Sequence, residues 1–156
     1  MNTDSDHQLR VSKIRNGTVI DHVTGGQALN VLRILGIDGS GGETVSIGMN
    51  VPSNRMGRKD IVKVEGRELS QEEVDVLSLI APDATINIVR DYDVIEKNRV
   101  ERPDRVVGVL SCPNRNCITN EREPVETEFA VFDDGLRCEY CETFIRERYA
   151  AHIEAE

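Results

Sequence analysis

Four cysteines are the residues whose types and spacing indicate chemistry most clearly in this chain. They form two close pairs, Cys112 with Cys117 and Cys138 with Cys141, and twenty residues separate the pairs. Two such pairs can bring four thiolates to one tetrahedral centre, which is the coordination of zinc in closed structural sites. Because four protein ligands leave no position for water, we expect one zinc ion that stabilises the fold and takes no part in catalysis.

Two other uses of four cysteines fit the sequence less well. Two disulfides would need an oxidising compartment, and no signal peptide precedes the first residues. An iron–sulfur centre also accepts four thiolates, but its common cysteine spacings differ from Cys-x4-Cys and Cys-x2-Cys. A segment as short as 104–156 buries little core by itself, so we expect it to unfold when zinc is removed.

The usual catalytic groups are scarce. No glycine-rich loop with a lysine and a serine or threonine is present to cradle phosphates. If all four cysteines hold zinc, none can act as a nucleophile, and nothing marks a catalytic pair among the 28 acidic residues. An enzyme is therefore the less favoured class of protein.

The charge distribution also restricts the partners. The net charge of the 156 residues is −9, and residues 104–156 hold 12 acidic and 6 basic side chains. Binding to nucleic acid needs a basic surface, so this acidic segment argues against a zinc-ribbon nucleic-acid-binding protein, although the cysteine spacing permits one. No apolar run approaches the length of a membrane span. We expect a cytoplasmic protein with neither nucleic acid nor membrane as a partner.

Apolar periodicity before residue 98 predicts the element order β-α-β-β-α-β, with an additional strand at the end. The expected strands cover 9–14 with 18–23, 43–51, 60–65, 84–89 and 93–97, and residues 52–59 are expected to form a loop. The expected helices cover 26–35, with Thr24 as the cap and Gly36 after the last turn, and 71–80, opened by a capping box of Ser70 and Glu73. This order is typical of an α+β, ferredoxin-like fold, in which both helices cover one face of an antiparallel sheet.

A polar stretch from 98 to 104 that contains Pro103 predicts a domain boundary, giving domains 1–103 and 104–156. The second domain should be small and β-rich, with strands at 106–111, 126–131 and 136–139. Residues 144–153 read as a terminal helix.

A few polar residues stand out within the predicted sheet. Asp21 and His22 end a strand, Lys63 interrupts an apolar strand, and Asn87 alternates with isoleucines. An acid beside an imidazole can bind hydroxyls and phosphates, and lysines can reach anionic oxygens. Each residue alone is more often an ordinary solvent-facing group, so the pattern by itself does not establish a site.

Six stretches together resemble the regulatory chain of aspartate carbamoyltransferase. They occur in order and span almost the whole sequence: Arg15–His22, Ile47–Ser53, Met56–Asp60, Ala81–Asn87, Cys112–Ile118 and Cys138–Cys141. The resemblance implies a noncatalytic subunit that controls pyrimidine biosynthesis. Its first domain would bind nucleotide effectors such as CTP and ATP, its zinc domain would dock on catalytic chains, and two regulatory chains would form a dimer.

The resemblance also implies particular site residues. The nucleotide site would use Val11, Lys13, Ile14, Val19, Asp21, His22, Lys63, Asn87, Val89, Tyr92, Val94 and Lys97. Lys97 and His22 would contact phosphates, Asp21 and Lys63 the ribose, and the backbone at Ile14 and Tyr92 the base. Asn114 and Asn116 would lie at the interface with the catalytic chain. The sequence departs from the better-known bacterial pattern at Lys13, Asn16 and Val89, which leaves effector preference open.

Overall fold

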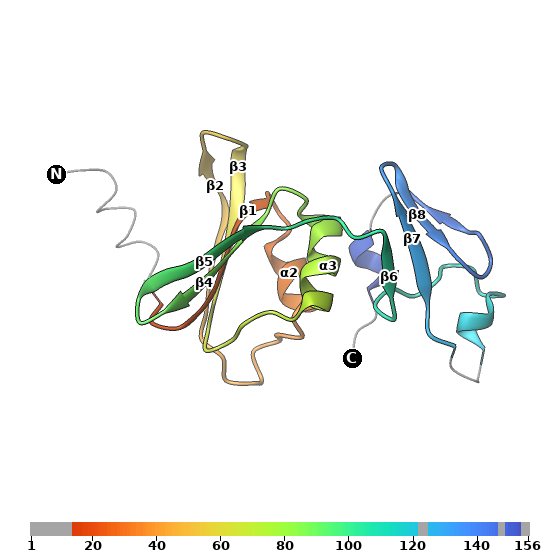
Figure 1. Ribbon diagram of the computed structural model, residues 1–156, viewed down its shortest axis with the longest axis horizontal. Coiled ribbons are helices and arrows are strands. Elements are labelled where there is room, and N and C mark those ends of the chain that lie inside the picture. Colours follow the sequence, from red (N-terminus) through yellow and green to blue (C-terminus); the bar gives the residue numbers. More distant parts are fainter. Residues whose placement is uncertain (1–13, 122–124, 147–148, 154–156) are drawn as a thin grey trace.

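In the computed structural model, which describes residues 14–121, 125–146 and 149–153, two sheets lie on either side of a pair of helices (Figure 1). The larger sheet has five strands in the order β2-β3-β1-β4-β5, and every neighbouring pair is antiparallel. Its strands are β1 Gly17–Thr24, β2 Val45–Ser53, β3 Gly57–Glu65, β4 Thr85–Arg90 and β5 Asp93–Arg99.

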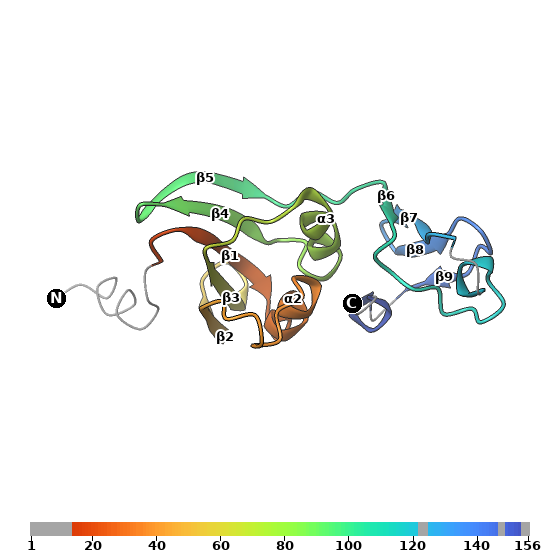
Figure 2. The same ribbon diagram turned by 90° about the horizontal axis from the view of Figure 1, so that it is seen from below.

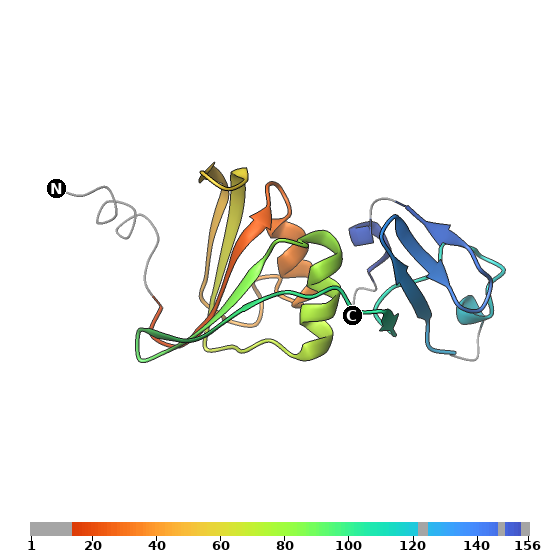
Figure 3. The same cartoon turned by 45° about the horizontal axis from the view of Figure 1, so that its top comes forward.

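Two helices cover one face of this sheet. They are α2, Ala28–Ile34, and α3, Gln71–Ile80, and both lie on the side that faces the smaller sheet (Figures 2 and 3). The core between the helices and the sheet contains fully buried Ile20, Val62 and Leu77. The order of β1 to β4 and the single helical layer confirm the predicted ferredoxin-like α+β fold, with β5 as an added edge strand. No helix in the described ranges is long and apolar enough to span a bilayer.

The start of β1 depends on a glycine. Gly17 has a φ of 142°, and a Cβ atom there would lie 2.1 Å from the carbonyl oxygen of Val64 on β3. Only a residue without a side chain allows the two strands to approach this closely.

A bulge interrupts β1 near its other end. The register shifts between Ile20 and Val23, and His22 has a φ of 56°, which a residue with a side chain rarely adopts. Bulges of this kind re-aim side chains and occur often beside functional sites.

Helix α2 is fixed at its start by a residue from another strand. Both carboxylate oxygens of the fully buried Asp60 on β3 accept backbone hydrogen bonds of 2.8 Å, one from Ala28 N–H and one from Asn50 N–H. The prediction that Thr24 caps this helix was wrong, because Thr24 ends β1 and Gln27 occupies the cap position without a side-chain bond.

The other predicted helix ends are confirmed. After α2, Gly36 has a φ of 69°, its N–H donates to Arg33, and the N–H of Ile37 donates to Leu32, which is the Schellman pattern. Before α3, Ser70 and Glu73 form the reciprocal capping box.

The segment 52–59 was wrongly predicted as a loop. Strands β2 and β3 form a hairpin in which Pro52 pairs with Arg58, leaving only 54–56 as the turn. Proline is tolerated there because β2 is an edge strand and needs no donor on its outer side. A bulge between Gly48 and Val51 also breaks the expected alternation, and Ile47 and Met49 of this edge strand are exposed.

The smaller sheet has the order β6-β7-β8-β9, from strands β6 Arg105–Val107, β7 Glu128–Phe132, β8 Gly135–Cys138 and β9 Phe144–Ile145. Short 3₁₀ turns, η1 Ile118–Asn120 and η2 Tyr149–His152, complete this domain. The prediction of a helix over 144–153 was wrong, because Ile145 pairs with Leu136 and is needed to cover the edge of β8.

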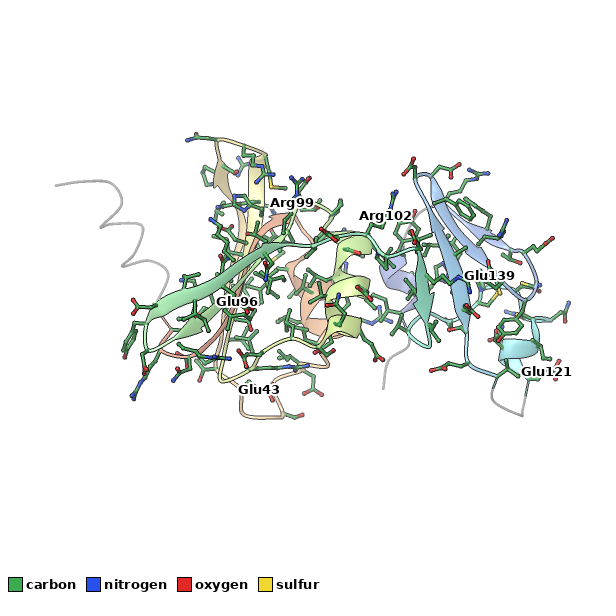
Figure 4. All side chains as sticks on the ribbon, in the orientation of Figure 1. Glu43, Glu96, Arg99, Arg102, Glu121 and Glu139 are labelled. Carbon is green, nitrogen blue, oxygen red and sulfur yellow. The ribbon has the colours of Figure 1, made fainter. Side chains whose placement is uncertain are left out.

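The two domains share apolar contacts. Val76 of α3 is buried in the same cluster as Leu110 and Phe129 of the smaller domain, and Tyr149 packs against both cores. Arg102, labelled in Figure 4, lies in the connection between the domains. It forms an ion pair with Asp133.

We expect Asp60→Ala to lower the free energy of unfolding of the zinc-loaded chain by roughly 2–5 kcal/mol, because two buried N–H groups lose their acceptor. Urea denaturation followed by circular dichroism would measure this. The matched control is Asp83→Ala, which removes an exposed carboxylate paired with Arg99 and should change the stability by about 1 kcal/mol or less. Equal losses in the two variants would contradict the structural role given to Asp60.

Candidate metal centre and effector site

The four cysteine sulfurs converge at one end of the smaller domain. All four Sγ atoms lie within 4.8 Å of one another, and three of the cysteines are buried. Cys112 Sγ is 3.5 Å from Cys141 Sγ, and Cys117 Sγ is 3.7 Å from Cys138 Sγ, with no disulfide between them. Four sulfurs around a tetrahedral zinc at a Zn–S distance of about 2.3 Å would be about 3.8 Å apart. The donor set and its spacing therefore fit one structural zinc ion.

Local hydrogen bonds shape the loop that holds the first cysteine pair. The amide of Asn120 donates to the carbonyls of Cys112 and Asn114, at 3.0 and 2.7 Å, and Cys117 N–H donates to the Asn114 carbonyl. Asn116 N–H donates to Asn114 Oδ1. These bonds turn the chain so that both sulfurs point to one centre.

The surroundings of the sulfurs affect their ionisation. Burial raises the pKa of the Cys112 and Cys138 thiols. Burial acts in the same direction on Cys141, but hydrogen bonds from Thr143 and Asn114 outweigh it and lower its pKa to about 6. Because zinc binds thiolates, the apparent affinity for zinc should increase as the pH rises.

Around this centre, several side chains face the solvent. Asn116 is exposed, Asn114 is half-buried within the loop, and the apolar side chains of Ile118 and Tyr140 are about half exposed, at 51% and 47%. Ile118 directly follows the first cysteine pair and Tyr140 lies within the second. Neither residue was predicted as a site residue, because the sequence does not reveal that their side chains are exposed.

Four of the residues predicted to bind the effector lie in one row on the sheet face that the helices leave open. Val19 of β1 pairs with Lys63 of β3 on one side and with Asn87 of β4 on the other, and Asn87 pairs with Lys97 of β5. Directly opposite residues on neighbouring strands point to the same face. Val19 is flanked by Thr18 and Ile20, which are fully buried, so this row of residues faces away from the core.

The bulge in β1 produces a polar cluster at one end of the row. Asp21 Oδ1 lies 2.9 Å from Lys59 Nζ and accepts from His22 N–H, and His22 Nδ1 is 3.2 Å from Thr85 Oγ1. Burial opposes ionisation of Asp21, but the bonds from Lys59 and His22 prevail and lower its pKa.

Lys59 was missed by the sequence reasoning. The chain has only four lysines beside 15 arginines, and three of the four, Lys59, Lys63 and Lys97, belong to this sheet. The scarcity of lysine could have indicated that these three residues have a specific role. Burial lowers the pKa of Lys63, with the charge of Asp21 acting in the opposite direction.

The turn between β4 and β5 lies at the other end of the row. Asp91 and Tyr92 both have positive φ, as a two-residue type I′ turn requires. Tyr92 N–H donates to the Arg15 carbonyl at 2.9 Å, which fastens the turn beside the segment that follows the buried Ile14. The N–H of Tyr92 is therefore already used and is not available for the predicted contact with a base. Val89 is buried and Val94 exposed near this turn, while Val11 and Lys13 lie outside the described residues.

Two family profiles match this chain. Residues 9–101 match the family profile for the aspartate carbamoyltransferase regulatory chain, allosteric domain, and residues 104–151 match the profile for the metal binding domain of the same chain. The chain belongs to the aspartate carbamoyltransferase regulatory chain family. It is thus similar to noncatalytic chains that carry an allosteric domain and a four-cysteine metal-binding domain.

Three relatives match over nearly their full length. The regulatory chain of Haloarcula marismortui is 72% identical over 154 residues, covering 99% of each sequence. That of Natronomonas pharaonis is also 72% identical, covering 96% of this chain and 97% of the relative. A more distant regulatory chain, from Methanoculleus marisnigri, is 58% identical with the same coverage.

We expect removal of zinc to unfold the smaller domain while the five-stranded sheet remains folded, because the metal joins the two segments that carry the cysteine pairs around a small core. Hydrogen exchange measured by mass spectrometry would show fast exchange in β6 to β9 and retained protection in β1 and β4. Unchanged exchange and circular dichroism after verified, complete zinc loss would contradict this expectation, and restoring zinc is the control.

Proposed function

We propose that this regulatory chain binds nucleotide effectors of the CTP and ATP type on the open face of the five-stranded sheet. In this proposal residues 1–103 form the effector domain and residues 104–156 form the zinc domain that docks on catalytic chains in the cytoplasm. The observation that carries the proposal is the cross-strand row of Lys63, Val19, Asn87 and Lys97, with Asp21 and His22 beside it.

The chemistry of this face suits a nucleoside triphosphate. Lys97 and His22 would bind phosphate oxygens, and Lys59, which forms an ion pair with Asp21 beside His22, adds a cationic group at this end of the face. Asp21 can accept from ribose hydroxyls while staying ionised, since its pKa is lowered. Lys63, whose ammonium is partly desolvated, would gain from an oxygen-rich ligand.

The base would bind near the β4–β5 turn. Backbone groups of Ile14 and Tyr92 would read its polar edge, and Val89 and Val94 would contact its faces. Val11 and Lys13 complete the proposed set. Backbone groups at fixed positions distinguish bases by their donors and acceptors, so this end of the site would determine effector preference.

The zinc domain would dock on a catalytic chain through the surface formed by Asn114, Asn116, Ile118 and Tyr140, which we call the knuckle surface. Exposed apolar side chains surrounded by polar groups are typical of protein interfaces. The internal bonds of Asn114 indicate that it shapes this surface, whereas Asn116 and Ile118 are available to a partner.

A second regulatory chain would pair through the allosteric domain. Strand β2 is an edge strand with exposed Ile47 and Met49, and such an edge is suited to pairing with another copy. Control of the catalytic chains then requires that the effector bind two quaternary states with unequal affinity.

We expect Lys97→Ala to weaken CTP binding by roughly tenfold or more, because a charge-assisted contact to phosphate is lost. Isothermal titration calorimetry on the zinc-loaded chain would measure this, and assembly with catalytic chains should be unaffected. Arg146→Ala removes one positive charge from the zinc domain, where Arg146 pairs with Asp134, and is the matched control. An unaltered affinity for CTP in Lys97→Ala would refute the proposed phosphate contact.

We expect Ile118→Glu to impair assembly with catalytic trimers while zinc content and CTP affinity are retained, because a charge enters an apolar contact. Analytical ultracentrifugation of mixtures would show free catalytic trimer. Val107→Glu is the control, since Val107 is similarly exposed, at 47%, but lies on β6. Normal assembly of Ile118→Glu would exclude the knuckle surface as the docking site.

A further inference from the structure

Residues 149–153, which we call the strap, are attached firmly to the zinc domain. Ile153 forms a β-bridge with Leu110, and the N–H and hydroxyl of Ser111 both donate to the His152 carbonyl, at 2.7 and 3.1 Å. Ser111 directly precedes the metal ligand Cys112. The strap is therefore bonded one residue away from the zinc centre.

The same strap also contacts the allosteric domain. Arg33, near the end of α2, donates from Nη2 to the carbonyl oxygen of Ile153 at 3.2 Å. Tyr149 packs against both hydrophobic cores, and the strap contacts α3. This segment of five residues therefore contacts both domains.

Helix α2 links the strap to the effector face. Its first residue, Ala28, is bonded to Asp60 on β3, and the neighbouring Lys59 reaches the opposite face to bind Asp21. The seven residues of α2 span about 10 Å and form a stiff element. A displacement of β3 or the β1 bulge would be carried along α2 to Arg33 and the strap.

The interface beside Arg33 is not fully packed. A cavity of about 620 Å³ that opens to solvent lies between the domains, lined by Leu29, Arg33, Glu72 and Val76 of the helices and by Val109 and Ile153 of the zinc domain. A close-packed interface would resist deformation. Open volume next to a bonded strap gives the domains room to change their angle while the strap stays attached.

We propose that the strap is the joint through which the zinc domain follows the effector domain, and that Arg33 is the positioning residue that couples them. This inference rests on the proposed function, because it describes how effector binding would reach the catalytic chains. Arg33 touches neither the nucleotide nor the zinc in this proposal. Its loss should therefore leave the affinity for CTP unchanged while it reduces the effect of CTP on the catalytic chains.

The test uses the zinc-loaded chain assembled with its catalytic chains, in wild-type form and as Arg33→Ala and Arg33→Lys. The control is Arg90→Ala, which removes an exposed arginine paired with Glu68 on the allosteric domain. Three quantities are measured with and without CTP: its affinity by calorimetry, the hydrogen exchange of the Ser111 amide, and the aspartate concentration for half-maximal rate.

In wild type and Arg90→Ala we expect CTP to change the half-maximal aspartate concentration by about fivefold or more, a typical allosteric coupling, and to change Ser111 exchange. In Arg33→Ala the affinity for CTP should stay within about twofold of wild type, while both responses fall below about twofold. Arg33→Lys retains a donor and should restore part of the response. A merely structural role for Arg33 would lower thermal stability without separating affinity from response.

A second variant tests the cavity at the interface without removing the strap bond. Leu29 is 61% exposed at the cavity, so Leu29→Trp should partly fill it and reduce the response to CTP while Arg33 is intact. Full responses in both Arg33→Ala and Leu29→Trp would overturn the inference and leave the proposed function standing. If CTP neither bound nor affected the wild-type assembly, the proposed function would fail, and this inference with it.

Discussion

Convergence of four thiolates on one point is the constraint on which the C-terminal third of this chain depends. The four-stranded sheet there is short, and its core holds few large apolar side chains besides Leu110, Phe129 and Leu136. A metal that joins Cys112 and Cys117 to Cys138 and Cys141 replaces the stabilisation that so small a core lacks. The knuckle surface and the strap both lie next to this centre, so the proposed docking and coupling would depend on the same four cysteines.

The five-stranded sheet must provide both a hydrophobic core and an accessible face. One face packs against α2 and α3 to form the core, which leaves the other face open to a ligand. The β1 bulge, with His22 in a disfavoured backbone conformation, places a charged cluster on the open face. Asp60 and Lys59, adjacent on β3, serve opposite faces: the first holds α2 and the second holds Asp21. The proposed effector site and the residue that holds α2 therefore share one strand.

Features specified by neighbouring residues could be predicted from the sequence. The capping box of Ser70 and Glu73, the Schellman end at Gly36 and the cysteine pairs all depend on residues at most a few positions apart. The fold order followed from apolar periodicity, and the row on the open face followed from the family resemblance once the register was known. These features required no knowledge of distant partners.

Features that depend on distant contacts could not be predicted. Asp60 caps a helix 32 residues away. Residues near the start of that helix do not indicate this contact, which is why Thr24 was predicted as the cap. Phe144 and Ile145 have no strong strand signal, but they are held by pairing with Arg137 and Leu136. Strand β2 can continue through Pro52 because it is an edge strand. The contact of Arg33 with Ile153 joins residues that are 120 positions apart.

The most direct measurement is a calorimetric titration of CTP into the zinc-loaded chain, alone and assembled with its catalytic trimers, followed by competition with ATP. Saturable binding of CTP at one class of sites, displaced by ATP, is the result expected if the open face of the sheet is the effector site. The absence of binding in both the free chain and the assembly would contradict the central claim and leave the chain with a bridging role only.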